Sequence, residues 1–207
     1  RDGGGKGHTV LKFNPDGDLV LTLGQPGMAG EGPNILNRPS DVAVARNGDI
    51  FVADGHSGMD TNMRIVKYSS DGTFLMEWGG KGSAPGQLNG AHGLAFDSRG
   101  RLFVADRENQ RVQIFDQDGG FIDAWTQFGS PSGIFISPDD VLYVADLAEG
   151  IRIGSARDGT VSAHIVAPVP AGGGAARVAE SVAVDAQGNL YAGENSGMKL
   201  LKFAPRR

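Results

Sequence analysis

Ser40-Asp41-Val42-Ala43-Val44 is the first of four copies of one short apolar segment. The other copies are His92-Gly93-Leu94-Ala95-Phe96, Ser132-Gly133-Ile134-Phe135-Ile136 and Glu180-Ser181-Val182-Ala183-Val184. Their central positions, 42, 94, 134 and 182, are 52, 40 and 48 residues apart. A repeat of this length is typical of stacked architectures, in which each unit buries its apolar surface against the next one.

Each copy is followed by further strand-like segments, which tight turns separate. The second segment is mostly apolar and ends in an acidic residue; its copies are 50–54, 102–106, 142–146 and 190–194. The third lies at 64–68, 111–115, 151–153 and 199–203, and the fourth, which follows Asp-Gly turns, lies at 74–78, 121–125 and 161–165. The inner segments are apolar on both faces and the outer ones are more polar. This gradient predicts an all-β β-propeller built of four-stranded blades.

The predicted blades form a single domain, 1–207. They span 40–78, 92–125, 132–165 and 180–204, and the outer strands of a preceding blade lie at 8–23. Because this count of strands does not close a ring, we expect the chain to be an incomplete arc of a larger ring that lacks its amino-terminal blades. The first residue is Arg1 rather than methionine, which agrees with a missing amino terminus.

The bulk composition argues against several classes of function. The net charge of -5 and the pI near 5.3 do not fit a protein that binds nucleic acid through a basic face. The absence of cysteine removes disulfides, thiolate chemistry and cysteine metal sites. The sequence contains no apolar stretch of the length that a transmembrane segment needs. We therefore expect a partner other than nucleic acid and no transmembrane segment.

One run of residues carries a family resemblance. The segment Asp106-Arg107-Glu108-Asn109-Gln110-Arg111-Val112-Gln113 has the Asp-x-x-Asn-x-Arg-Val-Gln pattern of NHL repeats. More narrowly, the chain resembles the catalytic domain of peptidyl-α-hydroxyglycine α-amidating lyase and the bacterial lyase-like NHL proteins. The stretches that support this are 10–15, 38–44, 51–55, 85–92 and 106–115. The resemblance implies a six-bladed NHL-type ring, so that this chain would be an incomplete arc of it.

The resemblance also implies a site. In that family three histidines hold zinc in the central channel, and the enzyme cleaves a peptidyl-hydroxyglycine during peptidylglycine amidation. His92 falls on one histidine position and Glu180 on another, while the catalytic arginine matches Arg107 and the catalytic tyrosine falls on His56. The implied cofactors are zinc or another divalent metal, with structural calcium as a further expectation. The resemblance also implies a periplasmic or secreted localisation.

The same residues have plainer readings. His92 and Glu180 suit a metal site because zinc accepts histidine nitrogen and carboxylate oxygen, but a buried histidine bonded to a backbone carbonyl fits the sequence as well. Arg107 suits a clamp for a ligand carboxylate, or a tie between two blades. His56 suits a proton acceptor, or a solvated loop residue.

Recurrence separates structural from functional acids. Asp54, Asp106 and Asp146 occupy one position in three blades, which predicts a carboxylate that holds local amides rather than a catalytic group. Asp41 differs from its counterparts in the other blades and is a candidate to line the channel.

Two hypotheses follow. The first is a divergent lyase-like NHL propeller that binds a small-molecule or peptide ligand, polar or carboxylated, in its central channel, with metal at His92 and Glu180 and catalytic roles for Arg107 and His56. The alternative is a non-catalytic propeller whose rim loops bind a protein or glycan partner.

Overall fold

The structure is a computed structural model, and it describes residues 7–56, 61–166, 179–194 and 198–205. Its elements are strands and one short 3-10 helix, η1 (Arg107–Asn109). Within these residues, no helix has the length and apolar character that a membrane crossing requires. The chain is therefore all-β, as the sequence predicts.

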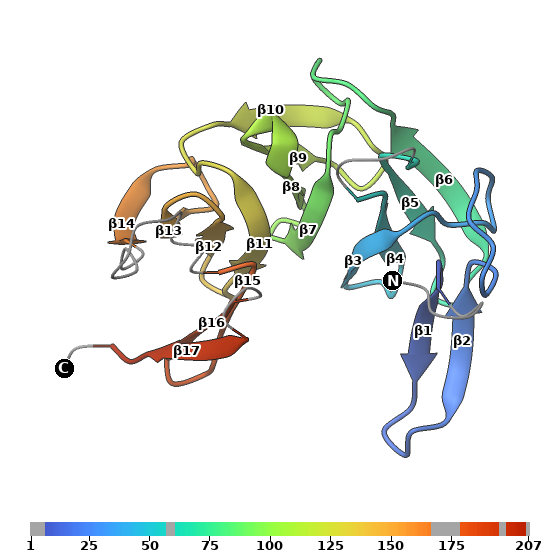
Figure 1. Cartoon of the computed structure of the whole chain (residues 1–207), viewed down its shortest axis with the longest axis horizontal. Coiled ribbons are helices and arrows are strands. Elements are labelled where there is room, and N and C mark those ends of the chain that lie inside the picture. The colour runs from blue at the N-terminus through green and yellow to red at the C-terminus, as the bar shows by residue number, and fades with distance from the viewer. Residues whose placement is uncertain (1–6, 57–60, 167–178, 195–197, 206–207) are drawn as a thin grey trace.

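The strands form four blades and one smaller sheet (Figure 1). Blade 1 contains β3 (Pro39–Val44), β4 (Ile50–Asp54), β5 (Arg64–Tyr68) and β6 (Phe74–Gly79). Blade 2 contains β7 (Ala91–Phe96), β8 (Leu102–Asp106), β9 (Arg111–Phe115) and β10 (Phe121–Trp125). Blade 3 contains β11 (Pro131–Ile136), β12 (Val141–Asp146), β13 (Gly150–Ser155) and β14 (Val161–Val166). Blade 4 contains β15 (Ser181–Val184), β16 (Leu190–Glu194) and β17 (Lys199–Phe203).

Neighbouring strands in each blade are antiparallel and follow chain order from the inside outward. The turns between the first two strands of a blade are tight; in blade 1 the turn contains Gly48 at φ 93°. That backbone conformation favours glycine. The predicted four-stranded blade is confirmed for blades 1, 2 and 3.

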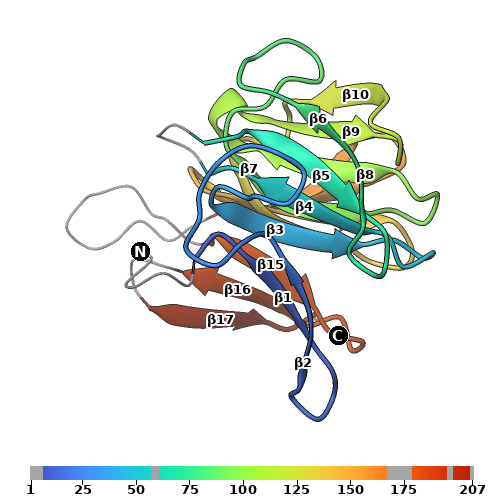
Figure 2. The same ribbon diagram turned by 90° about the vertical axis from the view of Figure 1, so that its right-hand side faces the viewer.

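The predicted size of the ring is wrong. The sequence predicts an incomplete arc of a six-bladed ring, whereas the structure is a propeller of four blades whose inner strands β3, β7, β11 and β15 line one central pocket. The number six came from the family resemblance, while the four copies of the inner segment already matched the blades that the chain builds. Strands β1 (Val10–Phe13) and β2 (Leu19–Leu23) form a separate two-stranded sheet. Figures 1 and 2 show this sheet beside blade 1.

Apolar layers between adjacent sheets hold the blades together. Successive residues of a strand point to opposite faces of its sheet, so Phe51 packs toward blade 2 while Val52 packs toward the β1–β2 sheet. In blade 2, Val104 faces blade 1 and Phe103 faces blade 3. All four of these side chains are fully buried. Because both faces of β4 and β8, the second strands of their blades, are covered, these two strands are buried along their whole length, which explains their similar apolar sequences.

Two glycines let the inner strands approach closely. A Cβ atom added at Gly93 would lie 2.8 Å from the carbonyl oxygen of Ser132, and one at Gly133 would lie 2.7 Å from that of Glu180. Real Cβ atoms essentially never show such distances. The glycines of the repeated inner segment therefore set the spacing between blades 2, 3 and 4.

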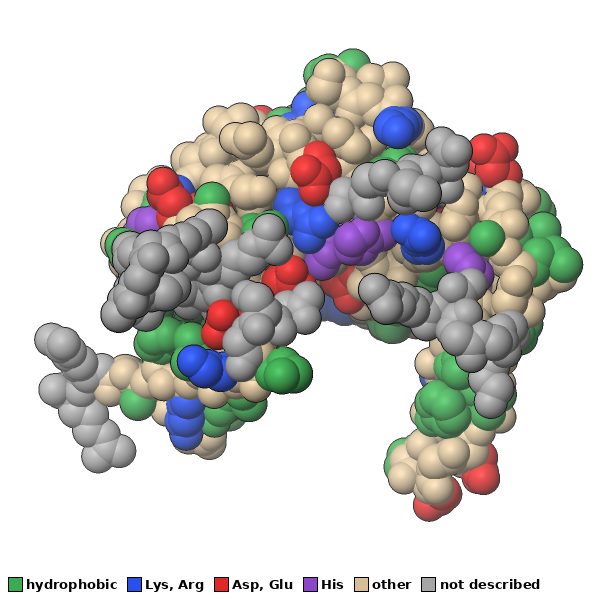
Figure 3. Space-filling view, in the orientation of Figure 1, with side chains coloured by type: hydrophobic (Ala, Val, Ile, Leu, Met, Phe, Trp, Pro, Cys, Tyr) green, Lys and Arg blue, Asp and Glu red, His purple; other side chains and the backbone are tan. Residues whose placement is uncertain are grey.

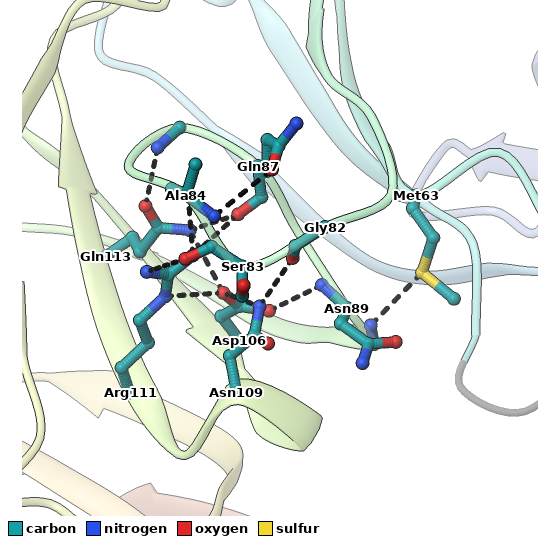
Figure 4. Close-up of polar contacts among 12 residues, drawn as sticks. Met63, Gly82, Ser83, Ala84, Gln87, Asn89, Asp106, Asn109, Arg111 and Gln113 are labelled. Carbon is teal, nitrogen blue, oxygen red and sulfur yellow. Dashed lines mark hydrogen bonds and ion pairs between the residues drawn. The ribbon is translucent and has the colours of Figure 1, made fainter.

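The recurring aspartates are structural, as the sequence predicts. Asp106 is fully buried, and its carboxylate accepts hydrogen bonds from the Asn89 backbone N–H (2.7 Å) and the Arg111 Nε (2.8 Å) (Figure 4). Asp54 and Asp146 are also fully buried. They hold Arg64 and Arg152 in the same way, with Nε to Oδ2 distances of 2.9 and 2.7 Å. Each aspartate thus ties the third strand of its blade to the loop that enters the innermost strand.

Candidate functional site

A pocket of about 740 Å³ lies where the four inner strands converge. Among the residues that the structure describes, its wall carries four ionisable groups besides His92: three carboxylates, from Asp41, Glu180 and Glu194, and one amine, from Lys199. Figure 3 shows histidine side chains at the centre of this face, with acidic and basic side chains around them. A site with this volume and mixed lining suits a small polar ligand.

His92 stands at the start of β7, and both of its ring nitrogens are engaged. Its Nδ1 lies 3.2 Å from the Ser132 hydroxyl, and its Nε2 lies 3.2 Å from the Nε2 of His56. The two imidazole rings are 5.0 Å apart between centroids and are tilted by 61°. His56 and His92 are far apart in the sequence, and the structure brings their Nε2 atoms together.

The environment of His92 disfavours its protonated form. Burial lowers the pKa of His92 to about 4, and the electrostatic interactions of His92 with Arg107 and His56 act in the same direction. The carboxylate of Glu180 opposes them and raises this pKa. His92 is therefore a neutral imidazole at physiological pH, which is the form of histidine that binds metal ions.

This lowered pKa predicts acid sensitivity. An unfolded histidine takes up a proton near pH 6.5, whereas folded His92 resists protonation down to about pH 4. The folded state therefore loses stability as the pH falls through this window, by about 1–2 kcal/mol between pH 7 and pH 5. Urea unfolding at the two pH values is expected to show this difference, and the His92→Gln variant should lose that part of the pH dependence. An unchanged pH dependence in the variant would contradict the prediction.

Glu180 and Asp41 enter the pocket from the fourth and first blades. Glu180 directly precedes β15, and its backbone N–H donates to the Gly193 carbonyl oxygen at 2.8 Å. Asp41 lies in β3, and its carboxylate accepts a hydrogen bond from the backbone N–H of Leu94 at 2.7 Å. Burial raises the pKa of Asp41. Asp41 thus both lines the pocket and joins blade 1 to blade 2.

Arg107 begins η1, immediately after β8. Its side chain is 9% exposed, and its Nε forms an ion pair with Glu108 at 3.1 Å. It is absent from the pocket wall, although its charge lowers the pKa of His92. Arg107 therefore lies close enough to His92 to act on it electrostatically.

A second group of potential metal ligands escaped the sequence analysis. Asp146, Glu149 and His164 have ligand atoms within 4.8 Å of one another. Arg152 already pairs with both acids, through its Nε to Asp146 and its Nη2 to Glu149. This guanidinium supplies the positive charge that the two carboxylates need, so the group is explained as an ion-pair cluster. His164 comes opposite Arg152 only through the register of β13 and β14, which the sequence does not reveal.

Comparison with known proteins agrees with the repeated fold. The NHL repeat family model matches residues 36–68 and 88–115, which include the inner three strands of blades 1 and 2. The chain is an NHL-repeat β-propeller. The family resemblance drawn from the Asp106–Gln113 run is thereby confirmed.

Named relatives of this NHL-repeat propeller fall into two groups. It is 42% identical over 149 residues to NHL repeat-containing protein 3 of Homo sapiens. This alignment covers 68% of this chain and 42% of that protein. It is 36% identical over 133 residues to peptidyl-alpha-hydroxyglycine alpha-amidating lyase 1 of Drosophila melanogaster, which covers 55% of this chain and 22% of that protein. The NHL-repeat propeller thus spans less than half the length of these curated relatives.

A solved streptogramin B lyase shares the fold of this NHL-repeat propeller. It matches with a TM-score of 0.65 at 16% identity, over 97% of this chain and 63% of the lyase chain. At this level of identity the likeness concerns the propeller architecture alone.

Proposed function

We propose that this NHL-repeat propeller binds a small polar or carboxylated ligand in its central pocket and carries out lyase-type chemistry there with a divalent metal held by His92. The observation that carries the proposal is the 3.2 Å separation between the Nε2 atom of His56 and that of His92, which lines the pocket. The 36% identity to an amidating lyase supports the type of chemistry.

The donor atoms fit a metal such as zinc. Two nitrogens bound to one tetrahedral zinc ion at ~2.05 Å are about 3.3 Å apart, which is close to the observed 3.2 Å. Glu180 faces the same pocket and offers a carboxylate oxygen. The Ser132 hydroxyl at Nδ1 fixes the orientation of the His92 ring, as partners of the second nitrogen commonly do in metal sites. When bound, such a metal polarises a hydroxyl or lowers the pKa of water.

The surrounding charges define what else the site accepts. Of the described residues, three carboxylates and one lysine line the pocket, so this part of the wall favours a cation such as a metal ion. The positive charge of Arg107 also acts on His92. In this proposal the ligand carboxylate is drawn by the metal and by Arg107, and His56 is a metal ligand or accepts a proton from the substrate.

A zinc titration tests whether His92, His56 and Glu180 bind a metal ion. Titration calorimetry with Zn²⁺ is expected to give one site in the wild-type protein, with affinity lowered at least about 100-fold by His92→Ala and about tenfold by His56→Ala or Glu180→Gln. His164→Ala is the matched control, because it removes a histidine from the Asp146 cluster instead. Zinc binding that survives His92→Ala, or that His164→Ala abolishes, would contradict the proposed metal site.

Product release tests the chemistry. A synthetic peptide ending in α-hydroxyglycine is expected to yield glyoxylate in the presence of Zn²⁺, and Arg107→Ala should reduce this rate while leaving zinc affinity nearly unchanged. A protein that binds zinc at His92 but releases no glyoxylate would refute the amidating reaction and leave the metal site standing. A protein that does neither would be the non-catalytic scaffold.

A further inference from the structure

A second pocket, of about 680 Å³, opens at the other end of the inner strands. Residues near the start of these strands, such as Ser40 and His92, line the central pocket. The second pocket is lined by residues at the ends of the strands, namely Val44, Phe96 and Ile136. The turns that follow β3, β7 and β11 complete its wall. The two pockets are thus separate sites at opposite ends of β3, β7 and β11.

The floor of the second pocket is apolar. Phe96, Phe135 and Ile136 are only partly buried there, and Val44 is 61% exposed. Phe96 is fixed by an edge-to-face contact with Phe51 at 5.1 Å, and Phe135 contacts Tyr143 at 6.1 Å. Rigid aromatic side chains at a pocket floor provide a preformed surface for a flat apolar group.

The rim of the second pocket is positively charged. Arg46 and Arg99 are exposed at the rim, and within the described part of the chain no hydrogen bond or ion pair holds either guanidinium group. The acid of this wall, Asp97, is already neutralised, because its Oδ2 pairs with the Arg101 Nε at 2.7 Å. Other arginines, such as Arg64, Arg111 and Arg152, are held by buried aspartates. The pocket therefore presents two uncompensated guanidinium groups beside an apolar floor.

We propose that the second pocket binds a small organic anion with an aromatic body, of the aromatic carboxylate class. The guanidinium groups of Arg46 and Arg99 pair with the carboxylate, because planar guanidinium and carboxylate groups form paired hydrogen bonds. The aromatic body lies on Phe96 and Phe135. The volume is in the range of small-molecule sites. This site is independent of the metal and of the chemistry proposed for the central pocket.

Calorimetry with naphthalene-2-carboxylate tests the proposal, with the isosteric neutral naphthalene-2-carboxamide as its comparison. The acid is expected to bind at least about tenfold more tightly than the amide. Added salt should weaken the binding of the acid and leave the binding of the amide unchanged. The Arg46→Gln/Arg99→Gln double variant should lower the affinity for the acid by about 10–100-fold. Val44→Asp, at an exposed position, should weaken it as well.

Arg38→Gln is the matched control, because Arg38 is an exposed arginine that precedes β3, at the opposite end of the strand. Its affinity for naphthalene-2-carboxylate should equal that of the wild type. The proposal is overturned if acid and amide bind equally, if the double variant binds like the wild type, or if Arg38→Gln loses as much affinity as the double variant. It is also overturned if naphthalene-2-carboxylate shows no binding at millimolar concentration, or if His92→Ala abolishes the binding.

Discussion

Replacement of Asp106 by alanine is expected to lower the free energy of unfolding by about 3–5 kcal/mol. The carboxylate is fully buried and accepts hydrogen bonds from Asn89, Asn109, Arg111 and Gln113. Its removal leaves the guanidinium of Arg111, a buried side chain, without a counter-charge. Urea unfolding monitored by tryptophan fluorescence measures the loss.

Two variants sharpen this test. Asp118→Ala changes an aspartate of the same blade whose side chain is 87% exposed, so its effect should stay within about 0.5 kcal/mol. The Asp106→Ala/Arg111→Ala double variant should lose less than the sum of the single losses, because the two residues share one interaction. Additive losses would show that Asp106 acts without Arg111 and would contradict the explanation.

A methyl group at Gly133 is expected to cost about 3 kcal/mol of stability and to weaken zinc binding at His92. The new Cβ would lie 2.7 Å from both the Glu180 carbonyl oxygen and the Ser181 Cα, which are backbone atoms that cannot rotate away. Blade 4 must therefore move away from blade 3, and Glu180 moves with it. Urea unfolding and Zn²⁺ titration of Gly133→Ala measure the two effects.

Ser181→Ala is the control for this prediction. Ser181 occupies the equivalent position in the fourth copy of the inner segment, and it already carries a side chain there. Because this change shortens a side chain and adds no atom, it should leave both stability and zinc affinity close to the wild-type values. A Gly133→Ala protein as stable as Ser181→Ala would show that the inner strands tolerate a wider spacing.

Much of the fold was predictable because the sequence repeats. The four copies of the inner segment predicted the blades, and the recurrence of Asp54, Asp106 and Asp146 predicted their structural role. The size of the ring was predicted wrongly, because six blades came from a resemblance while the structure has four. The angle between blades depends on packing between them, and the strand pattern of one blade does not encode it.

The candidate site was predictable in part. His92 and Glu180 differ from their counterparts in an otherwise constant segment, and both line the central pocket. The contact between His92 and His56 was not predictable, because His56 lies in a loop of blade 1 and no spacing rule aims it at blade 2. The ion-pair cluster at Asp146 and the second pocket were missed for the same reason: each combines residues from several strands.

The sequence by itself determined the strands and turns of each blade. Alternating polar and apolar residues, turn residues and recurring acids specify an antiparallel blade through local interactions along the chain. Only the tertiary structure decided which side chains of different blades meet. The apolar faces through which blades contact one another do not specify how the blades align. The contact between His56 and His92, and the position of Arg46 and Arg99 at one pocket rim, therefore follow from the packing of whole sheets.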